Sequence, residues 1–175
     1  MLKGFFMSKV IIIEKNKSLQ LKNILIFEVF HLQVLNENNK EQPMDFSMGI
    51  EITKMANEIQ SKGAQPVGPL IQFSGTNKKS DEDIEIKMSL MLQADRFIQN
   101  LDAPYTMEPV ISVKNCMYTR FTGYEDDITF AYQKIQVEAY ENEIKLTGNT
   151  YTVFLDSDEE TGTMTADIFM ESEHE

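Results

Sequence analysis

The stretch that decides the fold is VKNCMYTRFTGY, residues 113–124. Its first nine residues carry β-branched and aromatic side chains and are predicted to form a strand, and Thr122-Gly123-Tyr124 is predicted to turn the chain. An amphipathic helix is expected next, from about residue 125 to 146, closed by Thr147-Gly148-Asn149. Strand, turn and helix in this order indicate one structural unit, and the rest of the chain can be compared with it.

A similar plan occurs earlier in the chain. Residues 19–34 are predicted to form a long strand, and Lys22-Asn23 precedes its apolar run just as Lys114-Asn115 does in the later strand. Val10-Ile11-Ile12-Ile13, just before it, is predicted to be a short strand or a lead-in to one. A helix is expected over residues 44–62, with Gly63 at its C-terminus. Methionines recur on that helix at helical spacing, which indicates core packing more often than a binding surface.

Each helix is followed by two further predicted strands. In the first half these are residues 70–73 and 83–93, and in the second half residues 150–155 and 163–170. The acidic turn at 156–162 lacks the spacing of a calcium loop and is interpreted as a solvated hairpin tip. The sequence therefore predicts an α+β fold with two β-α-β-β units, an antiparallel sheet and two long helices.

The expected boundaries follow from this plan. We expect an N-terminal lead-in over residues 1–18, the first unit over 19–95, a linker over 96–109, the second unit over 110–172 and an acidic tail over 173–175, in one domain overall. Met7 is an alternative start, because the six residues before it fit no recognisable element.

Composition limits the function classes. The chain has 175 residues, 42% of them hydrophobic, and a net charge of −12, which disfavours direct binding of nucleic acid. No run of residues approaches the length needed to cross a bilayer, no signal peptide is evident, and a single cysteine suits a reducing compartment, so a cytoplasmic location without membrane contact is expected.

Motifs for common enzyme chemistry are not evident in the sequence. We find no phosphate-binding glycine loop, no His-Glu-x-x-His and no Gly-x-Ser-x-Gly elbow, and no cofactor or metal is expected. Cys116 is interpreted as a small buried hydrophobe rather than a nucleophile, because only His31 and His174 are available as partners.

Several of these segments resemble one family. Phe121-Thr122-Gly123-Tyr124 with the helix after it resembles the Gly-x-Tyr-leading helix of the gyrase-inhibitor-like domain, which is also the effector-binding module of multidrug-sensing transcription activators. Residues 147–156, 165–168 and 63–73 resemble its following strand, its closing strand and its first helix-to-strand passage. The resemblance spans about residues 19–172 and implies two units related by a pseudo-twofold axis around a central ligand groove.

The resemblance also implies a type of site. Relatives that sense drugs bind bulky, often cationic, aromatic compounds between aromatic walls, with a buried glutamate two residues before an aromatic residue in the third strand of the second unit. Phe154 matches that aromatic, but Thr152 stands at the glutamate position and cannot attract a cation as a carboxylate does. Asp167, Glu28 and Glu85 are the candidate replacements.

The expected groove combines residues from both units. Arg120 shares a strand face with Tyr118 and Cys116 by its spacing of two. Three alternatives are open for Arg120: an ion pair with Glu28, a bound anion, or an exposed edge position. For the aromatic residues, core packing and pocket lining are equally consistent with the sequence. The predicted groove residues are Glu28, Phe73, Tyr118, Arg120, Tyr132, Tyr151, Thr152, Phe154 and Asp167, with Phe27 as a further candidate.

Three functional classes follow. The first is a stand-alone protein that binds a small hydrophobic or aromatic molecule, and it is favoured. The second is a protein-interaction or inhibitory module, for which the acidic surface is suited. The third, a small hydrolase, is the least favoured, since Thr152 replaces the glutamate. Exposed strands at the ends of the sheet make a homodimer a further possibility.

Overall fold

The computed structural model describes residues 11–35 and 47–173. It confirms an α+β fold in which strands dominate. The elements are β1 (Glu14–Leu35), α1 (Met48–Ser61), β2 (Pro66–Ser80), β3 (Asp83–Ala94), β4 (Thr106–Tyr124), the 3-10 turn η2 (Glu125–Asp127), α2 (Ile128–Glu141), β5 (Leu146–Asp158) and β6 (Thr163–Ser172). The expected helix start at Met44, the apolar residues before Ile11 and the tail residue His174 lie outside the described residues.

All six strands form one closed barrel of antiparallel pairs. The order around the barrel is β1-β3-β2-β5-β6-β4, and β4 pairs with β1 to close it. The strand β1 pairs with both neighbours: with β4 from Glu14 to Ile26, and with β3 from Ile24 to Leu35. Closure removes the open edges that a flat six-stranded sheet would expose.

The two Lys-Asn pairs mark local irregularities of β1 and β4. Asn23 and Asn115 adopt positive φ values of 50° and 56°, a conformation that asparagine tolerates better than most residues. Leu21 and Ile24 reach the same core cluster although they are three residues apart, and so do Val113 and Cys116. At Asn115, β4 has one more residue than β1 between the pairs Val113–Leu19 and Cys116–Lys17, so this site is a β-bulge, whereas the pairing of β1 with β4 keeps its register across Asn23.

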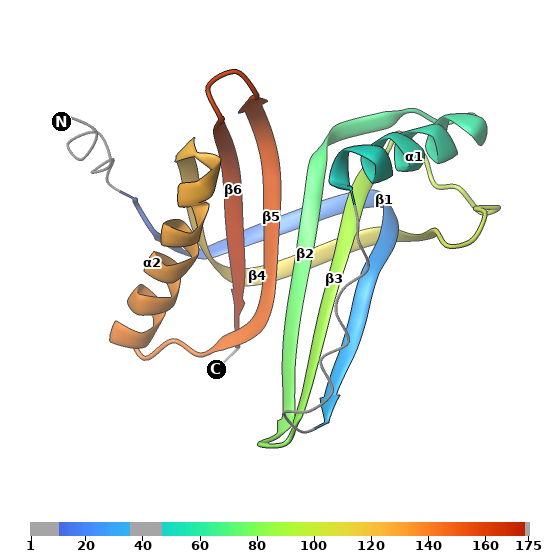
Figure 1. Cartoon of the computed structure of the whole chain (residues 1–175). Helices are drawn as coiled ribbons and strands as arrows, with labels where there is room; N and C mark the ends of the chain where they lie inside the picture. Colours follow the sequence, from blue (N-terminus) through green and yellow to red (C-terminus); the bar gives the residue numbers. More distant parts are fainter. Residues whose placement is uncertain (1–10, 36–46, 174–175) are drawn as a thin grey trace.

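The helices cover separate parts of the barrel wall (Figure 1). One core cluster draws side chains from all six strands and from neither helix, so it lies in the barrel interior. A second cluster packs under α2 around Ala131, Ile135 and Ala139, and a third under α1 around Met55 and Ile59. The burial of Met55 confirms that the methionine stripe packs into a core.

The C-terminal end of the second helix was predicted incorrectly. Helix α2 ends at Glu141, and Glu143 takes a positive φ of 56°, so the chain reverses and enters β5 at Leu146. The Ile144 amide donates to the Ala139 carbonyl at 2.8 Å, and Ile144 and Leu146 pack back onto the α2 cluster. Residues 147–149 thus belong to β5 and do not close a helix. The first helix ends as expected, with Gly63 at a φ of +80°.

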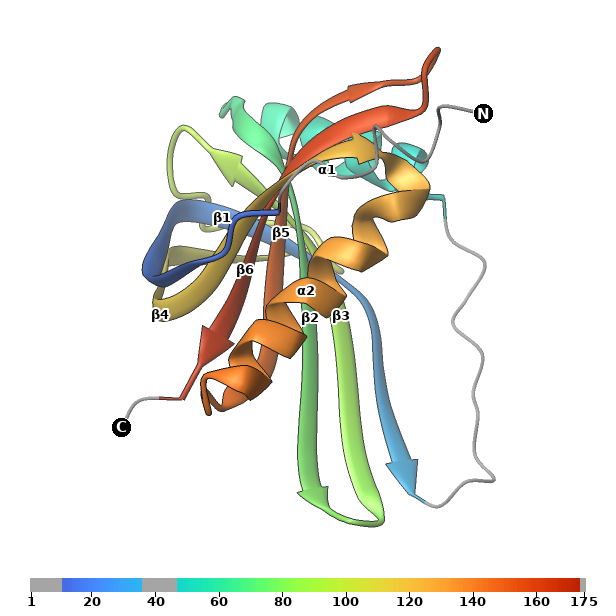
Figure 2. The ribbon, with the colours of Figure 1, turned by 90° about the vertical axis from the view of Figure 1, so that its left-hand side faces the viewer.

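Beyond the barrel, three strands continue as an extension (Figure 2). Strand β2 pairs with β5 only as far as Gly75, whereas its pairing with β3 continues to the hairpin at Ser80 and Asp83. The end of β1 runs along β3 to Leu35. Before β1, residues 11–13 form no regular element, and Ile11 and Ile13 pack against the α2 cluster. None of the helices in the described part of the chain is long and apolar enough to span a membrane.

Candidate functional site

Four aromatic residues form a continuous row across the barrel wall. Phe73 of β2 pairs directly with Tyr151 of β5, Tyr151 with Phe169 of β6, and Phe169 with Tyr118 of β4. Directly paired residues in an antiparallel sheet project from the same face. Phe73, Tyr151 and Phe169 pack in the interior cluster, so this face lines the barrel. We call Phe73, Tyr151, Phe169 and Tyr118 the aromatic row.

The rings of the row meet in two pairs. The Phe73 and Tyr151 centroids are 5.0 Å apart with planes tilted by 52°, and those of Tyr118 and Phe169 are 4.9 Å apart with a tilt of 42°. Such tilted arrangements are favoured by the ring quadrupoles. Tyr151 is 9% exposed, while the other three are half-buried. Tyr151 is therefore part of the core, while Phe73, Tyr118 and Phe169 keep part of their ring surface exposed to solvent.

Ser89 and Glu28 extend the row across two more strands. Ser89 of β3 pairs with Phe73 and with Glu28 of β1. The Ser89 hydroxyl is buried and has no hydrogen-bond partner among the described residues. A buried hydroxyl without a partner is unusual in a protein core, so a ligand atom beside Phe73 would find an unused donor and acceptor there.

A charged cluster lies next to the aromatic row, centred on Asp167, two residues before Phe169 on β6. The Arg120 guanidinium donates to both carboxylate oxygens of Asp167, at 2.7 and 3.0 Å, and the Tyr118 hydroxyl donates to Asp167 at 2.8 Å. The Arg120 side chain is 57% exposed and that of Asp167 only 14%. Burial, with Asp167 as the next cause, raises the pKa of Tyr118, which therefore stays a neutral hydrogen-bond donor. Asp167 is neutralised by this pair.

Glu171 is an acid of a different kind on the same strand face. Its carboxylate accepts hydrogen bonds from Thr147 at 3.1 Å and from Asn149 at 2.9 Å. No cationic nitrogen of the described residues lies within 4 Å of it, so its charge has no counter-ion there. Burial first, and Glu171 second, raise the pKa of Tyr151 to about 12 and that of Cys116 to about 11. Glu171 thus provides a negative charge beside the aromatic row.

Tyr132, Thr152 and Phe154 lie on the opposite face of the sheet. Tyr132 of α2 and Thr152 of β5 share a hydrogen bond of 2.5 Å between their hydroxyls, and Phe154 packs in the α2 cluster. Thr152 is 2% exposed. The structure therefore separates these three predicted groove residues from Phe73, Tyr118, Tyr151 and Asp167, which it brings together inside the barrel.

The hypothesis of an ion pair between Glu28 and Arg120 is wrong. Arg120 pairs with Asp167, whereas Glu28 lies 3.6 Å from the Lys87 ammonium and 3.9 Å from His31. Glu28 lies on β1 and Arg120 on the neighbouring strand β4. The pairs of these two strands run from Ile26–Thr106 to Glu14–Tyr118, so Glu28 and Arg120 lie beyond opposite ends of this ladder. The remaining candidate, Phe27, contacts Tyr105 under α1 at 6.0 Å between centroids.

Sequence reasoning missed Phe169, Ser89 and Glu171. Phe169 and Glu171 follow Asp167 at spacings of two and four, so strand alternation already placed them on the face of a predicted site residue. Glu171 stands two residues before the predicted acidic tail, and no local signal distinguishes Ser89. The interpretation of Cys116 as a buried hydrophobe is confirmed by its complete burial. Among the described residues, no cluster of three or more His, Cys, Asp or Glu side chains is arranged to hold a metal ion.

Comparison with solved structures identifies the fold. The crystal structure of the EcmrR C-terminal domain superimposes with a TM-score of 0.59 at 14% identity, covering 95% of this chain and 99% of that domain. The fold is similar to that of the EcmrR C-terminal domain. In the cryo-electron microscopy structure of an EcmrR–DNA complex, the TM-score is 0.61 at 14% identity, and the match covers 99% of this chain and 62% of the EcmrR chain.

Other comparisons add less. SAV2435 bound to tetraphenylphosphonium matches with a TM-score of 0.49 at 11% identity over 91% of this chain, a likeness too distant to bear on this chain's ligand. By sequence, the chain matches no protein-family model and no curated protein. The likeness to EcmrR therefore concerns the fold, and the chemistry has to be argued from the residues of this chain.

Proposed function

We propose that this chain is a small-molecule-binding protein of the gyrase-inhibitor-like, effector-binding type. Its ligand is a bulky aromatic molecule that lies in the groove between the two β-α-β-β units, against the aromatic row. The row carries the proposal, because four strands from both halves of the chain each contribute one ring to a single interior surface. Small-molecule sites combine such apolar walls with a few well-placed polar groups.

The polar groups around the row define the preferred ligand charge. Asp167 already has Arg120 as its counter-ion, whereas Glu171 has none among the described residues. A cationic group on the ligand beside Glu171 would gain an uncompensated electrostatic attraction that an anion would lack. Glu171 thereby supplies the negative charge for a cationic ligand that Thr152 cannot supply. The Ser89 hydroxyl is the further polar contact that we assign to the ligand.

The test is a binding titration with matched variants. Purified protein is titrated by calorimetry with an aromatic cation, an aromatic carboxylate and a neutral aromatic hydrocarbon derivative of similar size. We expect the cation to bind best, and Phe73→Leu and Tyr118→Leu to weaken it at least tenfold through lost ring contacts. Tyr140→Leu is the control, since Tyr140 is 86% exposed on α2 and outside the barrel. Equal binding by all four proteins would refute the site.

The charge assignment has its own test. Glu171→Gln keeps the hydrogen-bonding shape of the side chain and removes its charge, so it is expected to reduce affinity for the cation and not for the neutral compound. If both compounds lose affinity equally, Glu171 acts through structure rather than charge. The proposal that the aromatic row binds the ligand would then be kept, and the proposed preference for cationic ligands would be rejected.

A protein-interaction module is the second candidate, and one surface favours it. Phe130, Val137 and Tyr140 are 54%, 51% and 86% exposed on the outer side of α2, although the inner side of the same helix is buried. Given the net charge of −12, the expected partner is a protein with a basic surface around an apolar patch. If no compound of the panel binds, a pull-down with wild-type and Tyr140→Asp protein is the next experiment.

A further inference from the structure

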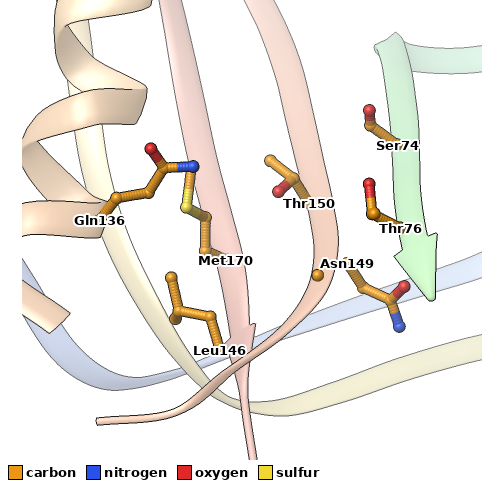
Figure 3. A pocket seen from close by; sticks show the side chains of 8 residues that line it. Ser74, Thr76, Gln136, Leu146, Asn149, Thr150 and Met170 are labelled. Atoms are coloured by element: carbon orange, nitrogen blue, oxygen red, sulfur yellow. The ribbon is translucent and has the colours of Figure 1, made fainter. Parts of the chain in front are cut away.

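A cavity lies outside the barrel, between α2 and the seam where β2 meets β5 (Figure 3). Its volume is about 380 Å³, within the range of small-ligand sites. Helix α2 contributes Gln136, and the strands β2, β5 and β6 contribute the remainder. The lining residues are Ser74, Thr76, Gln136, Leu146, Gly148, Asn149, Thr150 and Met170.

The sheet register explains the floor of this cavity. Ser74 pairs with Thr150, and Thr150 pairs with Met170, so these three side chains project together from the outer face of the barrel. The aromatic row projects from the inner face one residue earlier or later on the same strands. The cavity is therefore separated from the aromatic row by the thickness of the sheet.

Gly148 shapes one end of the cavity. It has a φ of +95°, and a Cβ built on it would lie 2.2 Å from the Thr76 carbonyl oxygen. Only glycine permits the β5 backbone to approach β2 this closely in that conformation. The backbone of Gly148 and the side chain of Thr76 therefore both border the cavity at this point.

The polar side chains of this cavity have unused hydrogen-bonding capacity. Within the described residues, the hydroxyls of Ser74, Thr76 and Thr150 and the amide of Gln136 make no side-chain hydrogen bond to the protein. Figure 3 shows the Gln136 amide reaching from α2 towards the strands, with the Ser74 and Thr76 hydroxyls opposite it on β2. Hydroxyls donate and accept, and a carboxamide does both through separate atoms. The site therefore suits a ligand with several mixed donors and acceptors.

The charge and apolar surface of the lining narrow the class of ligand. No ionisable side chain lines the cavity. Glu171 lies behind Asn149, whose amide donates to it, on the inner face of the sheet, so a charged ligand in the cavity would lose hydration without contacting a counter-ion. Leu146 and Met170 provide apolar surface, against which the C–H face of a ring can pack. We propose that this cavity binds an uncharged, hydroxyl-rich small molecule of the size of a mono- or disaccharide, at a site distinct from the aromatic row.

The experiment is an NMR titration of the full chain with glucose and maltose. Glucuronate and glucosamine serve as probes that keep the ring and add one negative or one positive charge. We expect saturable amide shifts for a neutral sugar that are concentrated at residues 74–76, 136 and 146–150. Binding by the charged analogues should be at least fivefold weaker, because the cavity offers no counter-ion.

Two variants test the assignment. Thr76→Val keeps the side-chain shape, Gln136→Ala removes the amide from an exposed helix position, and each should weaken neutral-sugar binding about fivefold or more. Gln133→Ala on the same helix is the control and should bind as the wild type does. Shifts that do not saturate, charged sugars that bind equally well, or binding unchanged in both variants would overturn the proposal. None of these results depends on whether the aromatic row binds a ligand.

Discussion

Replacing Arg120 by methionine should make the barrel interior more attractive to cations. Methionine keeps an unbranched stem of similar length but removes the charge that neutralises Asp167. Asp167 would keep the hydrogen bond from Tyr118 and would become a second uncompensated carboxylate near the aromatic row. The variant therefore separates two properties of Arg120, its contribution to stability and its effect on ligand charge.

The magnitudes follow from geometry and exposure. A bidentate pair of this kind contributes roughly 1–3 kcal/mol when buried, and about 1 kcal/mol is expected here because the Arg120 side chain is 57% exposed. Asp167 lies two residues from Phe169 on β6, or about 7 Å along the strand. A unit charge at about 7 Å contributes about 2 kcal/mol at an effective dielectric constant near 20. Halving this for solvent screening predicts roughly fivefold tighter binding of an aromatic cation.

The assay compares three variants by calorimetry and thermal unfolding. Lys134→Met changes the net charge equally on the outer side of α2 and should leave affinity unchanged. The double variant Arg120→Met/Asp167→Asn restores neutrality and should bind the cation as the wild type does. If Arg120→Met binds the cation no better than Lys134→Met does, the aromatic row is not where cations bind and the electrostatic argument fails.

Three further predictions concern stability and packing. The pKa of the Cys116 thiol is raised from its ordinary value of 9.0 to about 11. The thiol therefore ionises at lower pH in the unfolded chain, and the free energy of unfolding should fall by on the order of 2 kcal/mol between about pH 9 and pH 11. Urea unfolding should show a shallower pH dependence for Cys116→Ala than for the wild type. Tyr132→Phe removes the hydroxyl that shares a 2.5 Å hydrogen bond with Thr152 and should lower the free energy of unfolding by about 1 kcal/mol. Affinity for the aromatic ligand should not change. A loss of about 1 kcal/mol of binding free energy would instead place the ligand under α2. Gly75→Ala puts a Cβ 2.9 Å from the Phe73 ring and should displace that ring, which lowers the free energy of unfolding by about 1–3 kcal/mol. The displaced ring should also bind the aromatic ligand more weakly. Unchanged affinity would show that Phe73 does not contact the ligand.

The interior half of the candidate site was predictable from strand alternation. Tyr118, Tyr151 and Asp167 lie in strands whose period of two is clear in the sequence, and Phe73 ends a short apolar run. Which strands adjoin one another was not predictable in this way. The ring contact of Phe73 with Tyr151 depends on the pairing of β2 with β5, which joins distant parts of the chain. Local patterns carry no information on that pairing.

The faces of the strands were harder to predict than their existence. Asn115 lies in a β-bulge and Asn23 has a positive φ, and at both sites the inward-facing side chains are three residues apart instead of two. The sequence shows two matching Lys-Asn pairs but gives no direct sign that they are irregularities. Thr152 was placed in the groove by resemblance, although the residue before it, Tyr151, is the one that faces the barrel interior.

The early end of α2 has a different cause. Residues 142–146 contain neither glycine nor proline, so helical periodicity appeared to continue through them. The positive φ of Glu143 is unfavourable for glutamate by itself. Packing of Ile144 and Leu146 onto the α2 cluster compensates for it, and such tertiary contacts override local preference.

The closure of the barrel also constrains how the chain is made. When a ribosome has released only the first half, the edge of β1 that later pairs with β4 and the edge of β2 that later pairs with β5 are both uncovered. Either edge can be completed by the second half of the same molecule or by that of a neighbour. Refolding at high concentration should therefore yield dimers with exchanged halves, and two separately produced fragments divided near residue 100 should reassemble into one barrel when mixed.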